Sequence, residues 1–259
     1  MSEIISICNQ KGGVGKTTTV INLATYLALR KHKTLLVDID PQSNATDGIG
    51  IESKKLNKTI YNFLISSDLT TEAIIKEITI RTQVKDLFLI PSNTQLSGAE
   101  IELINLPQRE FCLKRGLGNI KNDYEYIFID CPPSLNLLTI NALTACDSVI
   151  IPIQCEYYAL EGLTRLLKTI KEVKDNLNSN LDIKGIVLTM ADFRTNLTKQ
   201  VIKEVQNFFK EETYKTIVPR CIRLSEAPGF GKPIALFSKR SQGAKAYLRL
   251  SNEFLRRNR

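Results

Sequence analysis

The sequence contains no tryptophan and a single histidine, His32, among its 259 residues. His32 lies between Lys31 and Lys33 just before an apolar run, where a solvated turn residue is expected, so histidine-based catalysis and a histidine-rich metal site are excluded. No apolar run approaches the roughly 18 to 20 residues that cross a bilayer, and the N-terminus lacks the pattern of a signal peptide. We therefore expect a cytoplasmic protein with no membrane partner.

The six cysteines show no spacing typical of a metal site or of a disulfide framework. No two of the six cysteines form a CxxC pair, and a chain of this length does not need disulfides to hold its fold, so we expect reduced thiols. Hydrophobic residues at 43% and charged residues at 24% match an ordinary globular protein, which excludes intrinsic disorder and low-complexity repeats. The length fits one large α/β domain over residues 1–259.

Short apolar, β-branched runs alternate with longer segments of helical periodicity, as in βα units around a parallel sheet. The predicted strands are 4–8, 34–37, 87–90, 126–129, 148–153 and 183–190. The predicted helices are 16–30, 94–105, 109–121, 135–145, 160–176, 197–211 and 243–257. The polar stretch 43–86 predicts a mobile loop followed by one or two short helices. The pattern indicates an α/β fold with a mostly parallel central sheet and helices on both faces.

A glycine loop with the sequence KGGVGKTT joins the first predicted strand to the first predicted helix. Its glycines let successive backbone N–H groups turn toward phosphate oxygens, Lys16 can reach the terminal phosphates, and Thr17 offers a hydroxyl to Mg²⁺. The common P-loop pattern requires glycine where this chain has Gln10, and the loop carries an additional lysine, Lys11. The nucleotide-binding residues predicted here are Lys11, Gly12, Gly13, Val14, Gly15, Lys16, Thr17 and Thr18.

Acidic residues follow two other apolar runs. The run TLLVD leads into Asp38 and Asp40, and the run YIFID ends at Asp130. Ligands bind beyond the carboxyl ends of parallel strands, so Lys16, Asp40 and Asp130 should converge on one crevice. Asp130 is predicted to hold Mg²⁺ through a water molecule, together with Thr17, and Asp40 to orient the attacking water. For Asp38 we expect a structural role.

The excess of positive charge is confined to the C-terminal quarter. Residues 194–259 hold 15 Lys and Arg against 5 Asp and Glu, a net charge of +10, whereas residues 1–193 hold 20 against 22. This excess is either a solvated basic face or a surface for a polyanion, and charge alone does not decide between DNA, RNA and anionic lipid.

The sequence resembles the ParA/Soj family of deviant Walker A chromosome- and plasmid-partitioning ATPases over nearly its whole length, with residues 50–90 the least specific part. The segments that carry the resemblance are KGGVGKTTT, VDIDPQSNAT, IFIDCPPSLNLLTINAL, PIQCEYYALEGL, LTMADFRTNL, VPRCIRLSEAPGFGKPI and SQGAKAYLRL.

The resemblance implies a Mg²⁺-dependent ATP hydrolase that forms an ATP sandwich homodimer, in which Lys11 reaches the nucleotide of the other subunit. Gly12 and Gly13 would let the two loops approach, and Val218 and Pro219 would line the adenine pocket. It further implies binding of double-stranded DNA without sequence preference, stimulation by a ParB-type partner, and a place at the nucleoid. The catalytic residues expected on this basis are Lys11, Lys16 and Asp40.

Two arginines join the charge distribution to the resemblance. Arg194 and Arg223 match positions that the family uses for contact with the DNA backbone, and both lie in the +10 segment. The alternative for each is a helix cap or a surface ion pair, for example with Glu226. Arg220 is assigned instead to the segment beside the adenine. Weaker DNA candidates, each more often a solvated charge, are Lys199, Lys232, Lys239, Arg240 and Lys245.

Three other functions share parts of this pattern. A MinD-like membrane ATPase would need an amphipathic tail beyond the last helix, where the apolar residues are instead spaced for core packing. A redox ATPase of the nitrogenase iron-protein kind would need cysteines that bridge a cluster, whereas Cys131 suits a packed position. A scaffold that binds ATP without turnover would not need Asp40. The apolar residues of the last helix are Ala244, Leu248, Phe254 and Leu255.

Overall fold

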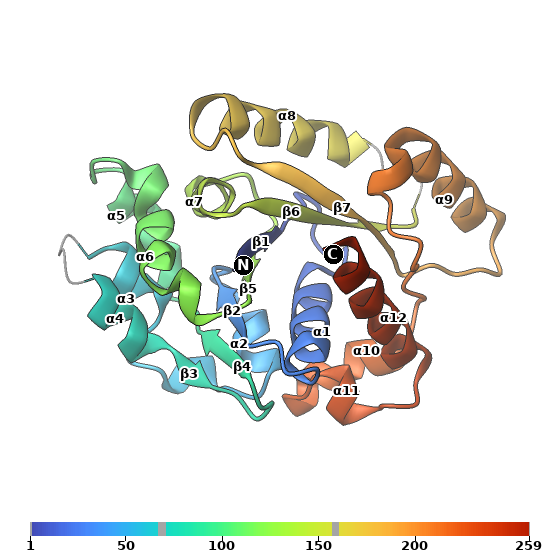
Figure 1. Ribbon diagram of the computed structural model, residues 1–259, viewed down its shortest axis with the longest axis horizontal. Coiled ribbons are helices and arrows are strands. Elements are labelled where there is room, and N and C mark those ends of the chain that lie inside the picture. Colours follow the sequence, from blue (N-terminus) through green and yellow to red (C-terminus); the bar gives the residue numbers. More distant parts are fainter. Residues whose placement is uncertain (1, 67–70, 157–160, 259) are drawn as a thin grey trace.

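The computed structural model describes residues 2–66, 71–156 and 161–258, and a seven-stranded sheet forms its centre (Figure 1). The strands lie in the order β3-β4-β2-β5-β1-β6-β7, and every neighbouring pair is parallel except β3 with β4. The strand bounds are β1 Glu3–Ile7, β2 Thr34–Asp38, β3 Ile80–Arg81, β4 Leu87–Ile90, β5 Tyr126–Asp130, β6 Ser148–Gln154 and β7 Asp182–Thr189.

Helices cover both faces of this sheet, which confirms the predicted fold class of a P-loop α/β protein. Their bounds are α1 Lys16–Ala28, α2 Asn44–Gly48, α3 Ile60–Leu64, α4 Thr71–Ile78, α5 Leu96–Leu103, α6 Cys112–Ile120, α7 Leu137–Ala145, α8 Glu161–Asn176, α9 Asn196–Phe209, α10 Ile222–Glu226, α11 Ile234–Phe237 and α12 Gln242–Arg257.

Alternation along the strands sends side chains into two separate hydrophobic cores. In β5, Ile127 and Ile129 belong to the core beneath α6, α7 and α8, whereas Phe128 belongs to the core beneath α1 and α12. In the second core Phe128 lies beside Phe254 of α12, with ring centroids 5.8 Å apart. A strand buried on both sides reads as a continuous apolar run, which explains why the central strands were predictable from sequence.

Two expectations about local structure were wrong. The stretch 43–86 holds α2, α3, α4 and the edge strand β3 among its described residues, where a mobile loop and one or two helices were predicted. On α12, Leu248 was expected in the core but is 40% exposed, because the buried side of the helix follows Ala244, Tyr247, Leu250 and Phe254 instead.

Strand order places the chemically important segments together. β5 lies between β2 and β1, and the register pairs Ile7 with Asp130 and Asp38 with Asp130. The carboxyl ends of these three strands therefore meet at one edge of the sheet, where the glycine loop, Asp38 and Asp130 emerge.

Candidate functional site

The glycine loop leads directly from β1 into the first turn of α1. Gly13 and Gly15 have φ of 76° and 86°, in the left-handed region that favours glycine. Gly15 is the N-cap of α1, so no side chain caps the first turn and its N–H groups are available to an anion. The loop is fixed to β7 through Val14, whose carbonyl accepts a hydrogen bond of 2.8 Å from the Thr189 hydroxyl.

Lys16 and Thr17 stand at the start of α1 and face the acidic end of the sheet. The Lys16 ammonium is almost buried and donates to the Lys11 carbonyl at 3.2 Å, across the mouth of the loop. The Thr17 hydroxyl donates to Asp130 Oδ2 at 2.7 Å. The predicted convergence of the loop with the end of β5 is therefore present.

Asp130 and Thr17 provide the oxygen atoms that a hydrated Mg²⁺ requires. Its Oδ1 is buried without a hydrogen-bond partner among the described residues, beside the Thr17 hydroxyl that Oδ2 accepts from. Burial, followed by the negative charge of Asp38, raises the pKa of Asp130 well above its ordinary value. A buried oxygen of this kind is suited to accept from a metal-bound water, since Mg²⁺ keeps several waters and takes few protein ligands. The residues therefore fit Mg²⁺.

Asp38 ties the end of β2 to α2. Its Oδ2 accepts from the Thr46 N–H at 2.8 Å and from the Thr46 hydroxyl at 2.7 Å, and its Oδ1 accepts from the Asp40 N–H at 3.1 Å. Burial raises the pKa of Asp38 to about 7, although the hydrogen bonds from Thr46 act in the opposite direction. These contacts agree with the structural role that the sequence predicted.

Asp40 lines the same cavity as the glycine loop. Its Oδ1 accepts from the Gln42 N–H at 2.9 Å, and its carbonyl accepts from the Ser92 hydroxyl at 2.8 Å. The first contact fixes the carboxylate and the second fixes the backbone of Asp40, at a cavity wall where a carboxylate can orient a water molecule.

The cavity has a volume of about 520 Å³ and a wall that the sequence analysis missed. Met190 directly follows β7, so the rule about strand ends could have located it. Leu224, Ala227 and Pro228 lie in the segment VPRCIRLSEAPGFGKPI, which carries the resemblance, but no contact with the nucleotide was predicted for them. Lys232, taken as a weak DNA candidate, also lies on this wall. This wall is fastened to α1 by the Ile234 N–H, which donates to Asn22 Oδ1 at 2.8 Å.

Some predicted nucleotide contacts do not line this cavity. Val218 is buried in the core, and Pro219 lines a different cavity. The Val14 side chain is buried as well, and Lys11 turns outward, with its ammonium 2.8 Å from Glu156 Oε2. Their roles toward the nucleotide remain predictions.

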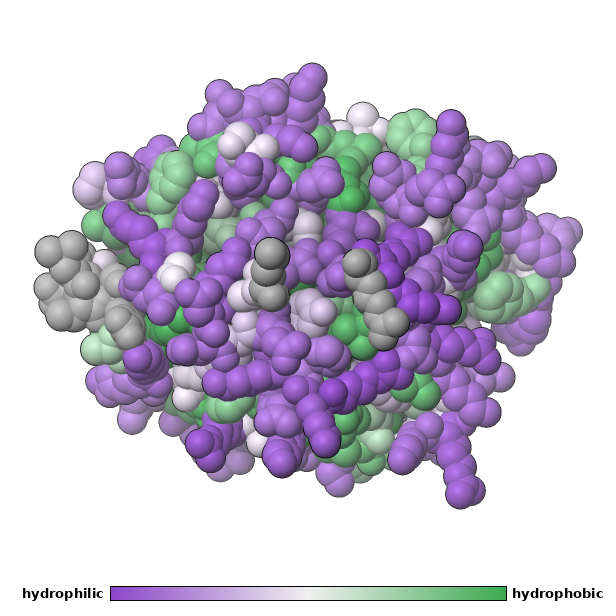
Figure 2. All heavy atoms as spheres, viewed as in Figure 1, coloured by the Kyte–Doolittle hydropathy of each residue, from purple (hydrophilic) through white to green (hydrophobic). Residues whose placement is uncertain are grey.

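The predicted DNA contacts all lie on the surface, on different elements. Arg194, with 89% of its side chain exposed, pairs with Asp192 at 2.6 Å. Arg223 on α10 pairs with Glu226 at 2.8 Å, the ion pair considered as its alternative. Lys199 on α9 and Arg240 before α12 are exposed. The face in Figure 2 is mostly hydrophilic, with apolar groups scattered between charged ones.

Two competing functions can be compared with the structure. No helix in the described ranges has both the length and the apolar character needed to cross a membrane. Cys131 is fully buried, and burial raises the pKa of its thiol well above the ordinary value, so it is not placed to bridge a cluster between subunits.

Comparisons with known proteins agree on one family. A family profile described as an AAA domain matches residues 2–183. The chain is 55% identical over 253 residues to the sporulation initiation inhibitor protein Soj of Bacillus subtilis, covering 98% of each protein. It is 50% identical over 258 residues to the chromosome partitioning protein ParA of Myxococcus xanthus, covering 100% of this chain and 89% of that protein.

A solved structure of cobyrinic acid a,c-diamide synthase from Mycobacterium smegmatis, with bound ADP and magnesium, matches with a TM-score of 0.85 at 34% identity, covering 99% of this chain and 95% of that one. That neighbour holds a nucleotide and Mg²⁺ on the same fold. The proteins named Soj and ParA are more similar to this chain in sequence.

Proposed function

Because the chain belongs to the ParA/Soj family of partitioning ATPases, we propose that it segregates DNA by binding and hydrolysing ATP. In this proposal the ATP-bound form is a homodimer that holds double-stranded DNA without sequence preference, and a ParB-type partner stimulates hydrolysis. The observation that carries it is the orphaned Asp130 Oδ1 beside the Thr17 hydroxyl, next to Lys16 at the start of α1.

The loop and α1 bind the phosphates. The N–H groups of the uncapped first turn and the Lys16 ammonium face the anion, while Thr17 and Asp130 hold the magnesium and its water. When bound, Mg²⁺ neutralises charge on the phosphates during transfer. Asp40, which also lines the cavity, orients the attacking water, with its own carboxylate fixed by the Gln42 N–H.

Lys11 completes the site of the other subunit. Its side chain leaves its own cavity and is 40% exposed, which supports a reach across an interface. A Cβ built on Gly13 would meet no atom within 4 Å, so the loop offers bare backbone to a close neighbour. Dimerisation would also double the +10 segment and so create a larger surface for DNA.

The apolar side of α12 supports DNA as the partner of this surface. Ala244, Tyr247, Leu250 and Phe254 pack in the core beneath α1 and are not available to a lipid surface. We propose on this basis that the protein acts in the cytoplasm at the nucleoid.

Four measurements on the purified protein test the proposal: sedimentation, phosphate release, and binding to nonspecific duplex and to anionic liposomes. Each is made with ATP, with ADP and without nucleotide. We expect an ATP-dependent dimer that binds duplex DNA of any sequence and leaves the liposomes free. ATP-dependent liposome binding without DNA binding would contradict the proposal and favour a MinD-like membrane function.

A further inference from the structure

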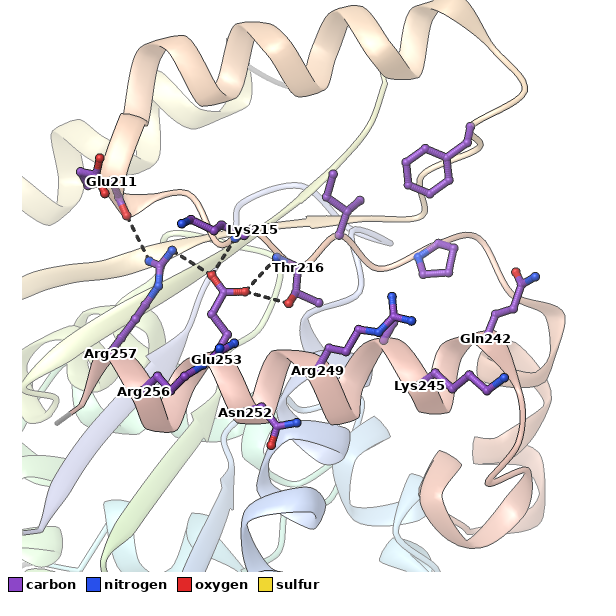
Figure 3. Close-up of a pocket in the computed structure, with 14 residues that line it drawn as sticks. Glu211, Lys215, Thr216, Gln242, Lys245, Arg249, Asn252, Glu253, Arg256 and Arg257 are labelled. Atoms are coloured by element: carbon purple, nitrogen blue, oxygen red, sulfur yellow. Dashed lines mark hydrogen bonds and ion pairs between the residues drawn. The ribbon is translucent and has the colours of Figure 1, made fainter.

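A second cavity, of about 920 Å³, lies between α12 and residues 211–219 and shares no lining residue with the phosphate-loop cavity (Figure 3). We call it the α12 groove. Its lining residues of charged or apolar character are Phe193, Glu211, Lys215, Ile217, Pro219, Lys245, Ala246, Arg249, Glu253, Arg256 and Arg257.

The far wall of the groove is a built part of the structure. Glu253 of α12 accepts from the Lys215 N–H at 2.7 Å and from the Thr216 N–H at 2.8 Å (Figure 3). Arg257 donates to the Thr213 carbonyl at 2.7 Å. Arg257 also stacks over the Tyr214 ring at 4.1 Å. Glu253 and Arg257 therefore bond to each other and fix α12 to residues 213–216, which form the far wall of the groove.

Four further cations line the groove with no partner for their charged groups among the described residues. Lys215, Lys245, Arg249 and Arg256 are exposed, and the acid Glu253 is occupied by the wall. Arg194 and Arg223 differ in this respect, since each already pairs with a neighbouring acid. The groove thus brings these four cations of the +10 segment together, while others, such as Lys199, Lys232 and Arg240, lie elsewhere on the surface.

Three of these cations form a row along α12. Helix geometry separates Lys245 from Arg249 by about 6 Å and Arg249 from Arg256 by about 10 Å along the axis. Phosphates recur along one DNA strand at about 3.4 Å of duplex axis, so the row spans several of them. Guanidinium groups bind phosphate oxygens in pairs, which suits Arg249 and Arg256 to this contact.

We propose that the α12 groove is the main track for the DNA backbone, with Arg194 and Arg223 at its margin. The proposal rests on the proposed function. Phe193 and Pro219 line the groove next to Arg194 and Arg220, so the groove continues into the surface that the sequence indicated. The row of cations favours a DNA strand as the occupant, whereas an acidic protein segment would anchor on the exposed Phe193 and the half-buried Ile217 and Pro219.

The test compares the salt dependence of duplex binding by the full-length protein with ATP. The variant Arg249→Ala with Arg256→Ala removes two exposed cations, and the control Arg81→Ala with Lys85→Ala removes the same charge near the edge strand β3. We expect the groove variant to flatten the log–log salt slope by roughly three to four units per dimer, because four phosphate contacts are lost. The control should keep the wild-type slope.

Other outcomes separate the groove from the proposed function. A groove variant that dimerises with ATP and binds duplex with the wild-type slope overturns the groove assignment and leaves the DNA function in place. An unchanged slope combined with lost stimulation by a ParB-type partner also overturns it, in favour of protein docking. A wild-type protein that binds no duplex overturns both proposals.

Discussion

The charged groups around the phosphate loop are buried, although burial disfavours the charged form of any acid or amine. Asp130 is fully buried, and Asp40 and Lys16 nearly so. Burial and the neighbouring Asp38 raise the pKa of Asp130, whereas Lys16 lowers it. Two buried acids as close as Asp38 and Asp130 are unfavourable without a cation nearby. The arrangement is therefore what a site that binds Mg²⁺ and phosphate would need.

We predict that substitution of Asp40 slows ATP hydrolysis without weakening ATP binding. Asp40→Ala should bind ATP and dimerise, because the loop, Lys16 and Thr17 are unchanged, but should hydrolyse ATP roughly 10²–10⁴-fold more slowly for want of an oriented water. Phosphate release and sedimentation measure the two properties.

Lys16→Ala is the contrasting variant, which should lose tight ATP binding altogether, since it removes the ammonium group that lines the phosphate-loop cavity at the start of α1. An Asp40→Ala protein with undiminished hydrolysis would transfer the catalytic role to another group.

Among the elements, α6 offers two glycines with opposite environments. A Cβ on Gly116 would lie 2.1 Å from Phe63 Cζ and 2.7 Å from Ile75 Cδ1, because α6 packs there against α3 and α4. Gly116→Ala should therefore lower the free energy of unfolding by about 1–3 kcal/mol through overpacking. Chemical denaturation measures this change.

Gly118 is the matched control in the same helix. A Cβ there would meet no atom within 4 Å, so Gly118→Ala should raise the free energy of unfolding by about 0.5–1 kcal/mol through helix propensity. Equal effects at the two positions would mean that α6 is not packed as described.

The junction of α12 with residues 213–216 predicts an acid-sensitive contact. Burial acts to raise the pKa of Glu253, but hydrogen bonds from Thr216 and Lys215 and the charge of Arg257 outweigh it and hold the pKa below the ordinary value. The folded pKa is lower than the unfolded one, so this stability is present above about pH 4.3 and is lost as pH falls through the folded pKa.

Glu253→Gln should accordingly flatten the pH dependence of stability in this acidic range. Thermal unfolding of both proteins between pH 3 and pH 7 measures the difference. A variant whose unfolding temperature falls with acid as steeply as the wild type would show that Glu253 is not the group responsible.

The elements predicted well from sequence are those with strong local signals. The strand Leu87–Ile90 was placed at its observed bounds, and α1 at its observed start, because apolar runs and the glycine loop mark them. β3 has only two residues and is defined by its pairing with β4, so no local sequence pattern predicts it. The segment with Leu224 and Pro228 was recognised as part of the family resemblance, but its place on the cavity wall depends on packing across the chain, through Asn22 and Ile234, and was not predicted.

Over the whole molecule, the basic surface and the phosphate-loop cavity are joined through α10. α10 carries Arg223 on the surface and Leu224 on the wall of the phosphate-loop cavity. A Cβ on Gly243, at the start of α12, would lie 2.6 Å from Leu224 Cγ, so α10 is wedged between that cavity and the helix that lines the groove. The phosphate-loop cavity and the helix that lines the groove are therefore connected by directly packed side chains.

Assembly is the property that Lys11 should control. Lys11→Ala should still bind ATP, because Lys16 and the loop N–H groups remain, but should fail to dimerise or hydrolyse if, as proposed, this lysine reaches the site of the other subunit. Glu156→Gln is the matched control, because it removes the charge that pairs with Lys11 at 2.8 Å within its own subunit and keeps an amide oxygen that can still accept from Gln154. An exposed pair of this kind contributes about 0–1 kcal/mol, so the control should dimerise at least as readily as the wild type. Sedimentation with ATP separates the two variants, and a Lys11→Ala protein that dimerises and turns over normally would refute the role of the second lysine.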